Sequence, residues 1–189
     1  MRYVVQHTEL VEGTVEARAY QLEAVDEALT GSMLLVLPTA AGKTAVSWML
    51  IAEILQKKQG WILFIAPTGA LVDQHTKDLN RVIKNYEAIS ITGVNEPKKR
   101  EKLWKTSRLI VATPQVVRND VLNGSLSLNK CSLLILDEAH HSTGKHAMAQ
   151  SAEMYNSASE SKLIFGTTAS PGSNSVVINE ICKRLEIER

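Results

Sequence analysis

Short apolar runs alternate with longer amphipathic stretches along most of this sequence, and no other feature constrains the fold as strongly. Each run has the length of a β-strand, and several are apolar almost throughout, which is typical of strands covered on both faces. Because helical stretches lie between the runs, the pattern predicts βαβ units, and therefore an α/β fold with a predominantly parallel sheet and helices on both faces. The predicted strands are Met33–Leu37, Trp61–Ala66, Ala88–Ile91, Arg108–Ala112, Ser132–Leu136 and Lys162–Gly166.

The amphipathic stretches are predicted as helices, and local signals mark some of their ends. Thr113 offers a capping hydroxyl before Pro114, a residue favoured at the first helical position, and Asn123-Gly124 is a typical stop. We interpret the densest charge run, Lys98–Lys102, as a solvated helix face in preference to a contact surface for nucleic acid. The predicted helices are Tyr20–Leu29, Thr44–Lys57, Ala70–Lys84, Glu96–Lys105, Pro114–Leu122, Lys145–Asn156 and Val176–Leu185.

Length and composition indicate one domain with a sizeable core, since the chain has 189 residues, of which 44% are hydrophobic and 22% charged. We expect a single domain over residues 1–189, with an N-terminal extension at 1–16 and a helical region at 17–31. The 21 Lys and Arg residues against 20 Asp and Glu residues give a net charge of +1. This balance excludes a broadly cationic protein that holds nucleic acid by bulk electrostatics, but it leaves room for a local basic groove.

The cysteines and the apolar segments exclude two further classes. Cys131 and Cys182 lie far apart and form no CxxC pair, so neither a disulfide framework nor a zinc ribbon is indicated. Met1–Glu12 lacks a signal-peptide core, and every apolar run is far shorter than the ~20 residues that span a bilayer. We therefore expect a cytoplasmic protein without a membrane partner, associated with the nucleoid if the source is archaeal.

The segment after the first predicted strand has the composition of a phosphate-binding loop. Small residues let backbone N–H groups approach phosphate oxygens, and the N-terminus of the following helix adds partial positive charge. Lys43 can reach the β- and γ-phosphates, and the Thr44 hydroxyl can ligate Mg²⁺. Leu37 stands where the full Walker pattern has its first glycine. The predicted nucleotide-binding residues of this segment are Pro38, Thr39, Ala40, Ala41, Gly42, Lys43 and Thr44.

A second motif supplies acidic residues at the end of another apolar strand. Asp137 follows Ser132–Leu136 and would hold Mg²⁺ at the carboxyl end of the strand, while Glu138 would orient or deprotonate the attacking water. A helix cap with a first-turn acid is the structural alternative, and it does not account for the phosphate loop upstream. With Lys43, these two acids are the predicted catalytic residues. His140, His141 and His146 lack the partners and spacing of a zinc site.

Asp-Glu-Ala-His after a buried strand, with Pro-Thr-Ala-Ala-Gly-Lys-Thr upstream, resembles the first RecA-like domain of a superfamily 2 helicase of the DEAD/DEAH type. Arg18-Ala19-Tyr20-Gln21 is similar to the Q-motif, which implies that Arg18 and Gln21 bind the nucleotide and that Gln21 reads the adenine edge; the family also places His140 at this site. The resemblance implies ATP and Mg²⁺ as cofactors. It implies nucleic-acid contacts at Pro67, Thr68, Gly69, Thr92, Gly93, Thr113, Pro114 and Gln115, and a coupling element at Thr168, Ala169 and Ser170.

The motif combination is most similar to the Hef/FANCM branch of fork-processing DNA helicases, which favours branched DNA over RNA as the partner. Two positions depart from the branch, since Gly69 stands where a basic residue is frequent and His141 where arginine is usual. Nothing after Pro171 can supply the motifs of a second RecA-like domain. We therefore expect the 189 residues to hydrolyse ATP very slowly unless such a domain is present.

Two alternatives remain open. The first is an RNA-directed motor of the RIG-I-like, Dicer-like or DEAH class, because the motifs contact only the phosphodiester backbone. The second is a single-lobe, nucleotide-gated binding module, which would need no Glu138. Individual residues also have structural interpretations: Gln21 as an exposed polar residue of an amphipathic helix, Thr113 as a helix cap, and Thr168 and Ser170 as the closure of a turn.

Overall fold

A parallel β-sheet lies at the centre of the computed structural model, which describes residues 1–38, 42–169 and 175–188. The strands of this sheet lie in the order β3-β8-β7-β4-β6-β5, and each described pairing is parallel. The predicted α/β class is therefore confirmed. The strands are β3 (Met33–Val36), β4 (Trp61–Ile65), β5 (Ala88–Ile91), β6 (Leu109–Ala112), β7 (Cys131–Asp137) and β8 (Ile164–Thr168).

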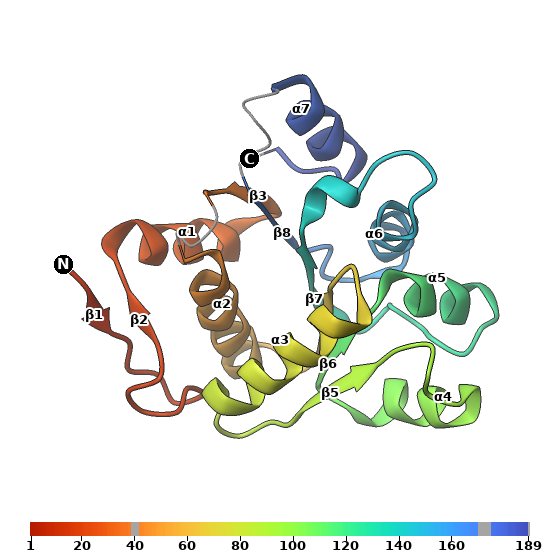
Figure 1. Cartoon of the computed structure of the whole chain (residues 1–189), viewed down its shortest axis with the longest axis horizontal. Helices are drawn as coiled ribbons and strands as arrows, with labels where there is room; N and C mark the ends of the chain where they lie inside the picture. Colours follow the sequence, from red (N-terminus) through yellow and green to blue (C-terminus); the bar gives the residue numbers. More distant parts are fainter. Residues whose placement is uncertain (39–41, 170–174, 189) are drawn as a thin grey trace.

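Helices cover both faces of the sheet because the strands are apolar on both faces. Along β4, Ile62 and Phe64 belong to one hydrophobic cluster, while Leu63 and Ile65 belong to the other. Figure 1 shows α1 (Ala19–Thr30), α2 (Lys43–Lys57) and α3 (Gly69–Val82) on one side of the strands. The other face is covered by α4 (Pro97–Thr106), α5 (Pro114–Leu122), α6 (Ala147–Ala158) and α7 (Ser175–Arg184).

The last strand of the sheet lies later than the sequence predicts. The prediction ended at Gly166, whereas β8 begins at Ile164 and continues through Thr167 and Thr168, both buried. Lys162, predicted as the first strand residue, has φ of +49° and so cannot lie in an extended strand. The shift places two hydroxyl groups at the carboxyl end of β8.

The N-terminal segment packs against the domain in a way that the sequence pattern does not predict. β1 (Tyr3–Val4) pairs antiparallel with β2 (Glu16–Ala17), and strands of two residues carry no periodicity. Leu10 is buried and forms an isolated bridge with Ile83 after α3. No helix in the described part of the chain is long and apolar enough to cross a membrane.

One prediction within the charge run Lys98–Lys102 is wrong. Arg100 is not solvated: its guanidinium forms two hydrogen bonds to the carboxylate of Asp120 on α5, at 2.9 and 3.0 Å, and donates to the Asn95 carbonyl. Trp104 is buried and donates its indole N–H to the same carboxylate at 2.8 Å. Burial alone would raise the pKa of Asp120, but these hydrogen bonds and the Arg100 charge outweigh it and lower that pKa. The cluster fastens α4 to α5.

We expect Asp120→Ala to lower the free energy of unfolding by about 3–5 kcal/mol, because it leaves the buried Arg100 charge unpaired. The measurement is urea-induced unfolding at neutral pH. Glu101→Ala is the matched control, since Glu101 pairs with Lys105 on the exposed face of the same helix, and its effect should stay below about 0.5 kcal/mol.

The loss in free energy of unfolding caused by Asp120→Ala should also depend on pH. Because the folded pKa of Asp120 lies below the ordinary value of about 3.9, its carboxylate stabilises the fold fully above that value. The stabilisation is lost as the pH falls through the folded pKa, so the difference between Asp120→Ala and the parent should shrink there. Equal penalties for the Asp120 and Glu101 variants at neutral pH would contradict this assignment.

Candidate functional site

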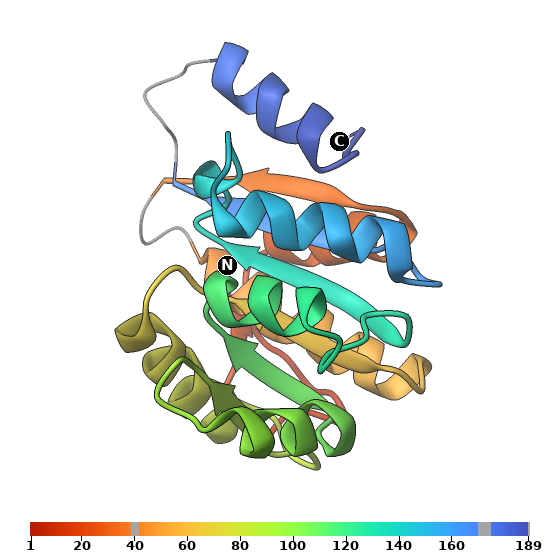
Figure 2. The same ribbon diagram turned by 90° about the vertical axis from the view of Figure 1, so that its right-hand side faces the viewer.

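The strand order places the predicted nucleotide-binding motifs in one half of the carboxyl edge of the sheet and the predicted nucleic-acid motifs in the other half. Strands β3, β8 and β7 are adjacent, and at their carboxyl ends lie the start of the phosphate loop, Thr167-Thr168 and Asp137-Glu138, respectively. Strands β4, β6 and β5 are adjacent in the other half, and the loops after them carry the predicted nucleic-acid motifs. In Figure 2 the arrowheads of the strands point to the same side of the molecule. Ligands of open parallel sheets bind at this carboxyl edge.

The register of β3, β8 and β7 aligns the carboxyl ends of these three strands at the edge of the sheet. Val36 of β3 lies opposite Thr168 of β8, and Asp137 of β7 lies opposite Thr167. The Leu37 N–H continues the ladder by donating to the Thr168 carbonyl at 3.2 Å. The chain therefore leaves β3 at the level of Asp137, one strand away from it.

The phosphate loop enters α2 through Gly42, which has a φ of +87° and precedes Lys43 at the helix start. As the N-terminal capping residue, Gly42 has no side chain to occupy the first N–H groups of the helix, so these can face a ligand. Lys43 and Thr44 lie in the first turn and are half-buried. Pro38 is exposed, while Thr39, Ala40 and Ala41 lie outside the described residues.

Gln21 joins helix α1 to the phosphate loop. Its side chain is buried, with 5% exposure; Oε1 accepts from the Arg18 N–H at 2.7 Å, and Nε2 donates to the Gly42 carbonyl at 3.0 Å. The interpretation of Gln21 as an exposed helix residue is therefore wrong. An amide has two donor hydrogens and two acceptor lone pairs, and the bonds to described residues use one of each. Arg18 is exposed at the start of the same helix.

Two side chains from different elements hold the carboxylate of Asp137. Oδ2 accepts a hydrogen bond from Nε2 of His75 on α3 at 2.9 Å, and the Thr167 hydroxyl lies 3.5 Å from Oδ1. The sequence interpretation did not single out His75. The signal was present, because His75 falls in the stripe formed by Val72, Leu79 and Val82 on the buried face of α3.

Glu138 adopts a backbone conformation that is uncommon for a residue with a side chain. Its φ of +53° and ψ of 54° lie in the left-handed region and turn the chain from β7 into the short helix η1 (Ala139–His141). Such strained residues cluster at functional sites. The Glu138 side chain is 43% exposed, and one carboxylate oxygen lies 3.6 Å from Nε2 of His141. It is thus accessible to a water molecule at the sheet edge.

His140 connects the acidic motif to the end of β8. Its Nδ1 lies 3.0 Å from the Thr168 hydroxyl, which donates to the Ala169 carbonyl. Burial lowers the pKa of His140, and the charges of His141 and Lys43 lower it further against the opposite effect of the two acids. Thr168 of the predicted coupling element thus contacts the Asp-Glu-Ala-His segment. Ser170 lies outside the described residues.

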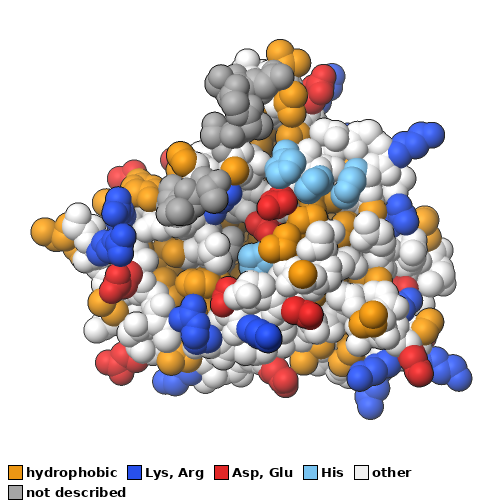
Figure 3. All heavy atoms as spheres, in the orientation of Figure 1, with side chains coloured by type: hydrophobic (Ala, Val, Ile, Leu, Met, Phe, Trp, Pro, Cys, Tyr) orange, Lys and Arg blue, Asp and Glu red, His pale blue; other side chains and the backbone are white. Residues whose placement is uncertain are grey.

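Three histidines at this motif form a row of contacting rings. His140 and His141 have ring centroids 4.4 Å apart, and His141 stacks on His146 at 5.2 Å. Figure 3 shows histidines in a row next to acidic side chains, with Lys and Arg spread over the visible face rather than gathered. Ligand atoms of Glu138, His140 and His141 lie within 4.8 Å of one another, so this group could take a metal ion beside Asp137. The sequence interpretation did not expect one.

In the second half, Thr68 and Gly69 open helix α3. The Thr68 hydroxyl accepts from the Leu71 N–H at 3.2 Å, so it serves as a helix cap. Both residues are exposed, and Pro67 before them is half-buried. A capped first turn still leaves N–H groups open to solvent, which suits a backbone phosphate.

The Thr92-Gly93 turn follows β5 and is closed by its own side chains. The Thr92 N–H donates to Oδ1 of Asn95 at 2.9 Å, and the Val94 N–H lies 3.4 Å from the Thr92 hydroxyl. Val94 is 92% exposed at the tip of the turn. Because Arg100 holds the Asn95 carbonyl, the buried Arg100–Asp120 pair fixes the position of this turn.

The structure contradicts the capping role predicted for Thr113. Thr113 precedes α5 in an extended conformation, but its side chain makes no capping hydrogen bond. Pro114 offers no N–H at the first helical position and has its φ fixed by the ring, so it starts the helix without that cap. Thr113 and Pro114 are buried and Gln115 is exposed, which leaves Gln115 as the accessible residue of this motif. Ala112 lies opposite both Ile65 and Ile91, so this loop lies between the other two.

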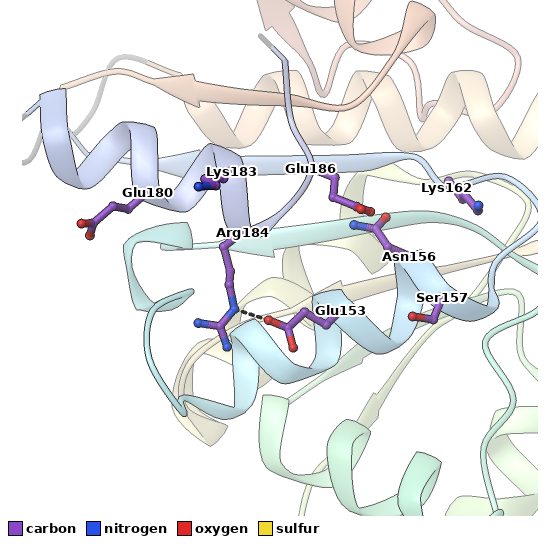
Figure 4. Close-up of a pocket in the computed structure, with 8 residues that line it drawn as sticks. All are labelled: Glu153, Asn156, Ser157, Lys162, Glu180, Lys183, Arg184 and Glu186. Atoms are coloured by element: carbon purple, nitrogen blue, oxygen red, sulfur yellow. Dashed lines mark hydrogen bonds and ion pairs between the residues drawn. The ribbon is translucent and has the colours of Figure 1, made fainter.

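The pocket in Figure 4 does not belong to this edge. It has a volume of about 560 Å³ and lies between α6, α7 and the turn that precedes β8, toward the amino end of that strand. Arg184 in it pairs with Glu153 and donates to the Gly144 carbonyl. Basic and acidic groups balance in its lining, which offers little for a triphosphate: Glu153, Asn156, Ser157, Lys162, Glu180, Lys183, Arg184 and Glu186.

The sheet order, with Gly-Lys-Thr after β3 and Asp-Glu after β7, defines a RecA-like α/β domain. The chain belongs to the DEAD/DEAH box helicase family, since a model of that family matches residues 18–177. In structure it is similar to the Hef helicase domain of Pyrococcus furiosus, with a TM-score of 0.86 and 37% identity over 92% of this chain and 37% of that chain. The sequence resemblance to the Hef/FANCM branch is confirmed.

Two curated relatives show how far the likeness extends. Methanocaldococcus jannaschii MJ1505, which is named as an ATP-dependent RNA helicase, is 42% identical over 97% of this chain and 24% of its own length. The ATP-dependent DNA helicase mph1 of Sclerotinia sclerotiorum is 32% identical over 90% of this chain and 14% of its own. The chain thus spans a quarter or less of these relatives, whose names divide between RNA and DNA.

We expect Gly42→Ala to lower the free energy of unfolding by about 2 kcal/mol or more, because a Cβ there meets the Gln21 amide and φ is positive. In a Gln21→Ala background, the same change should cost only about 1–2 kcal/mol, since the backbone penalty alone remains. Gly31→Ala is the control, with extended backbone and open space around it. Equal costs of Gly42→Ala in the two backgrounds would show that Gln21 does not restrict position 42.

Proposed function

We propose that this chain is the ATP-binding lobe of a nucleic-acid-dependent ATPase of the helicase type, acting on branched or forked DNA. The observation that supports this most directly is the convergence of Gly42–Thr44, Asp137-Glu138 and Thr167-Thr168 at the ends of three adjacent parallel strands. A binding module would need the phosphate loop but not an acid beside it, so Glu138 favours an enzyme over the scaffold alternative.

In this proposal, ATP lies over the carboxyl ends of β3, β8 and β7. Lys43 and the N-terminus of α2 hold the phosphates, with Pro38, Thr39, Ala40, Ala41 and Gly42 as the loop, and Gln21 with Arg18 lies at the adenine side. The Thr44 hydroxyl and the Asp137 carboxylate are oxygen donors of the kind that Mg²⁺ prefers, so the residues present fit this ion. When bound, Mg²⁺ neutralises charge on the phosphate oxygens.

Glu138 accepts a proton from the attacking water or orients that water. The backbone strain at Glu138 turns its side chain away from the strand and leaves it partly exposed at the edge. His140 transmits changes at this loop to Thr168 through their 3.0 Å contact, which links hydrolysis to the coupling element with Ala169 and Ser170.

Nucleic acid lies across the other half of the edge in this proposal. Its phosphates meet the first turn of α3 after Pro67, the Thr92-Gly93 turn and the start of α5 with Gln115. These are backbone and hydroxyl contacts, which position a strand without reading bases. Membership of the Hef/FANCM branch favours branched DNA over the RNA alternative. A second RecA-like lobe would close over both halves and supply arginines.

Lys43→Ala should weaken ATP binding by about tenfold or more, because it removes a charge-assisted hydrogen bond to the phosphates. Glu138→Gln should retain binding while ATP turnover falls by about 10²–10⁴-fold. Binding of a fluorescent ATP analogue and steady-state phosphate release measure the two effects, with thermal unfolding as the check of the fold. Wild-type turnover in Glu138→Gln would remove Glu138 from the catalytic role.

Turnover should be stimulated by nucleic acid and should require a second lobe. We expect the 189 residues alone to hydrolyse ATP slowly, and a protein that joins them to a second RecA-like lobe to be about 10³–10⁵ times faster, as arginine fingers provide. Phosphate release is measured with forked DNA, linear duplex DNA and duplex RNA. Greater stimulation by duplex RNA than by forked DNA would favour the RNA-directed alternative.

A further inference from the structure

His75 makes a polar contact that the motif description does not use. It lies in the second turn of α3, and its Nε2 lies 2.9 Å from Oδ2 of Asp137, the last residue of β7. The two side chains are 12% and 19% exposed, so water screens the contact only partly. Because an ionised carboxylate only accepts hydrogen bonds, Nε2 carries the proton.

Packing alone does not explain a histidine at this position. Its ring packs against Phe64 of β4, with centroids 4.6 Å apart, and continues the buried stripe of α3. Its Nδ1 is buried and has no hydrogen-bond partner among the described residues. A buried, unpaired nitrogen costs free energy, whereas leucine or methionine would fill the stripe without that cost. The contact with Asp137 is therefore the polar interaction that this histidine provides.

The contact also restricts how Asp137 can present its oxygens. The bond from α3 to Oδ2 restricts rotation of the carboxylate, and Oδ1 lies 3.5 Å from the Thr167 hydroxyl at the nucleotide half of the edge. A carboxylate without the His75 contact could rotate about its Cβ–Cγ bond, whose energy profile is broad. Ligands of a metal ion are commonly oriented by such outer contacts.

We propose that His75 is a positioning residue for the Mg²⁺-binding Asp137: its Nε2–H holds Oδ2 on the α3 side so that Oδ1 is presented to the metal of the nucleotide. This inference rests on the proposed function, because it assigns a role to a residue behind the same site.

The test compares the Mg²⁺-dependent part of nucleotide binding between variants of the 189-residue chain. The affinity for the fluorescent analogue mant-ATP is measured in saturating Mg²⁺ and in excess EDTA, and the ratio of the two affinities is the readout. We expect His75→Leu to lower this ratio about tenfold, through the affinity in Mg²⁺ alone. His75→Gln retains an N–H donor and should restore the ratio to within about twofold of the parent. Mn²⁺ in place of Mg²⁺, followed by electron paramagnetic resonance, reads metal occupancy directly.

Controls separate this role from a purely structural one. Asp73→Ala changes the exposed face of the same helix and should leave the ratio unchanged. If His75→Leu does not fold in thermal unfolding, His75→Met removes the donor with a flexible side chain of similar volume. An equal loss of affinity in Mg²⁺ and in EDTA, or no loss at all, overturns the proposal. If the parent chain itself shows no Mg²⁺-dependent nucleotide binding, that result contradicts the proposed function, and the His75 inference, which rests on it, is overturned as well.

Discussion

The parallel pairing of β8 between β3 and β7 is the interaction on which the site depends. β8 pairs with both neighbours, so the backbone register alone brings the end of β3, the threonines of β8 and the acidic residues at the end of β7 to the same edge of the sheet. Gly166 permits this close packing, because a Cβ there would lie 3.0 Å from Leu34 and 3.2 Å from Ala139. A larger residue at this position would separate β8 from the chain that carries Glu138.

The order of the strands then divides the edge by function. Three strands carry the phosphate and metal motifs, and three carry the motifs assigned to nucleic acid. The chain forms β3 of the first group, then β4, β5 and β6 of the second, and returns to the first group with β7 and β8. Helix α3 belongs to both halves, since it begins at Gly69 in one and places His75 against Asp137 in the other. The buried Arg100–Asp120 pair fixes one loop of the second half, the Thr92-Gly93 turn, through the Asn95 carbonyl.

Most of the architecture could be predicted from the sequence because burial on both faces leaves long apolar runs. The six strands and the helices between them follow from this signal, and the two site motifs follow from their positions after strands. The failures share a cause. Arg100 was assigned to solvent because its neighbours are charged, and Thr113 was assigned a cap because its residue type favours one. In both cases a partner distant in sequence, or a neighbouring proline, decides the outcome.

Contacts between residues of different helices and strands cannot be predicted from hydrophobic periodicity. His75 lies in a recognisable apolar stripe, but its partner lies 62 positions away and is defined only by the register of β7 against β4. The start of β8 depends on Lys162, whose positive φ keeps this residue out of the strand. The N-terminal pairing of β1 with β2 is too short to leave a pattern.

The two hydrogen bonds of the Gln21 side-chain amide affect which nucleotide base the site would accept. The Arg18 N–H points at one end of the amide and the Gly42 carbonyl at the other, so the protein backbone decides which end is oxygen and which is nitrogen. In its proposed role, the amide then offers a neighbouring base one donor and one acceptor in a fixed order. Adenine presents the complementary pair at N7 and N6, whereas guanine presents two acceptors. In that role, the Arg18 N–H and the Gly42 carbonyl would orient the Gln21 amide for adenine rather than guanine before a nucleotide binds.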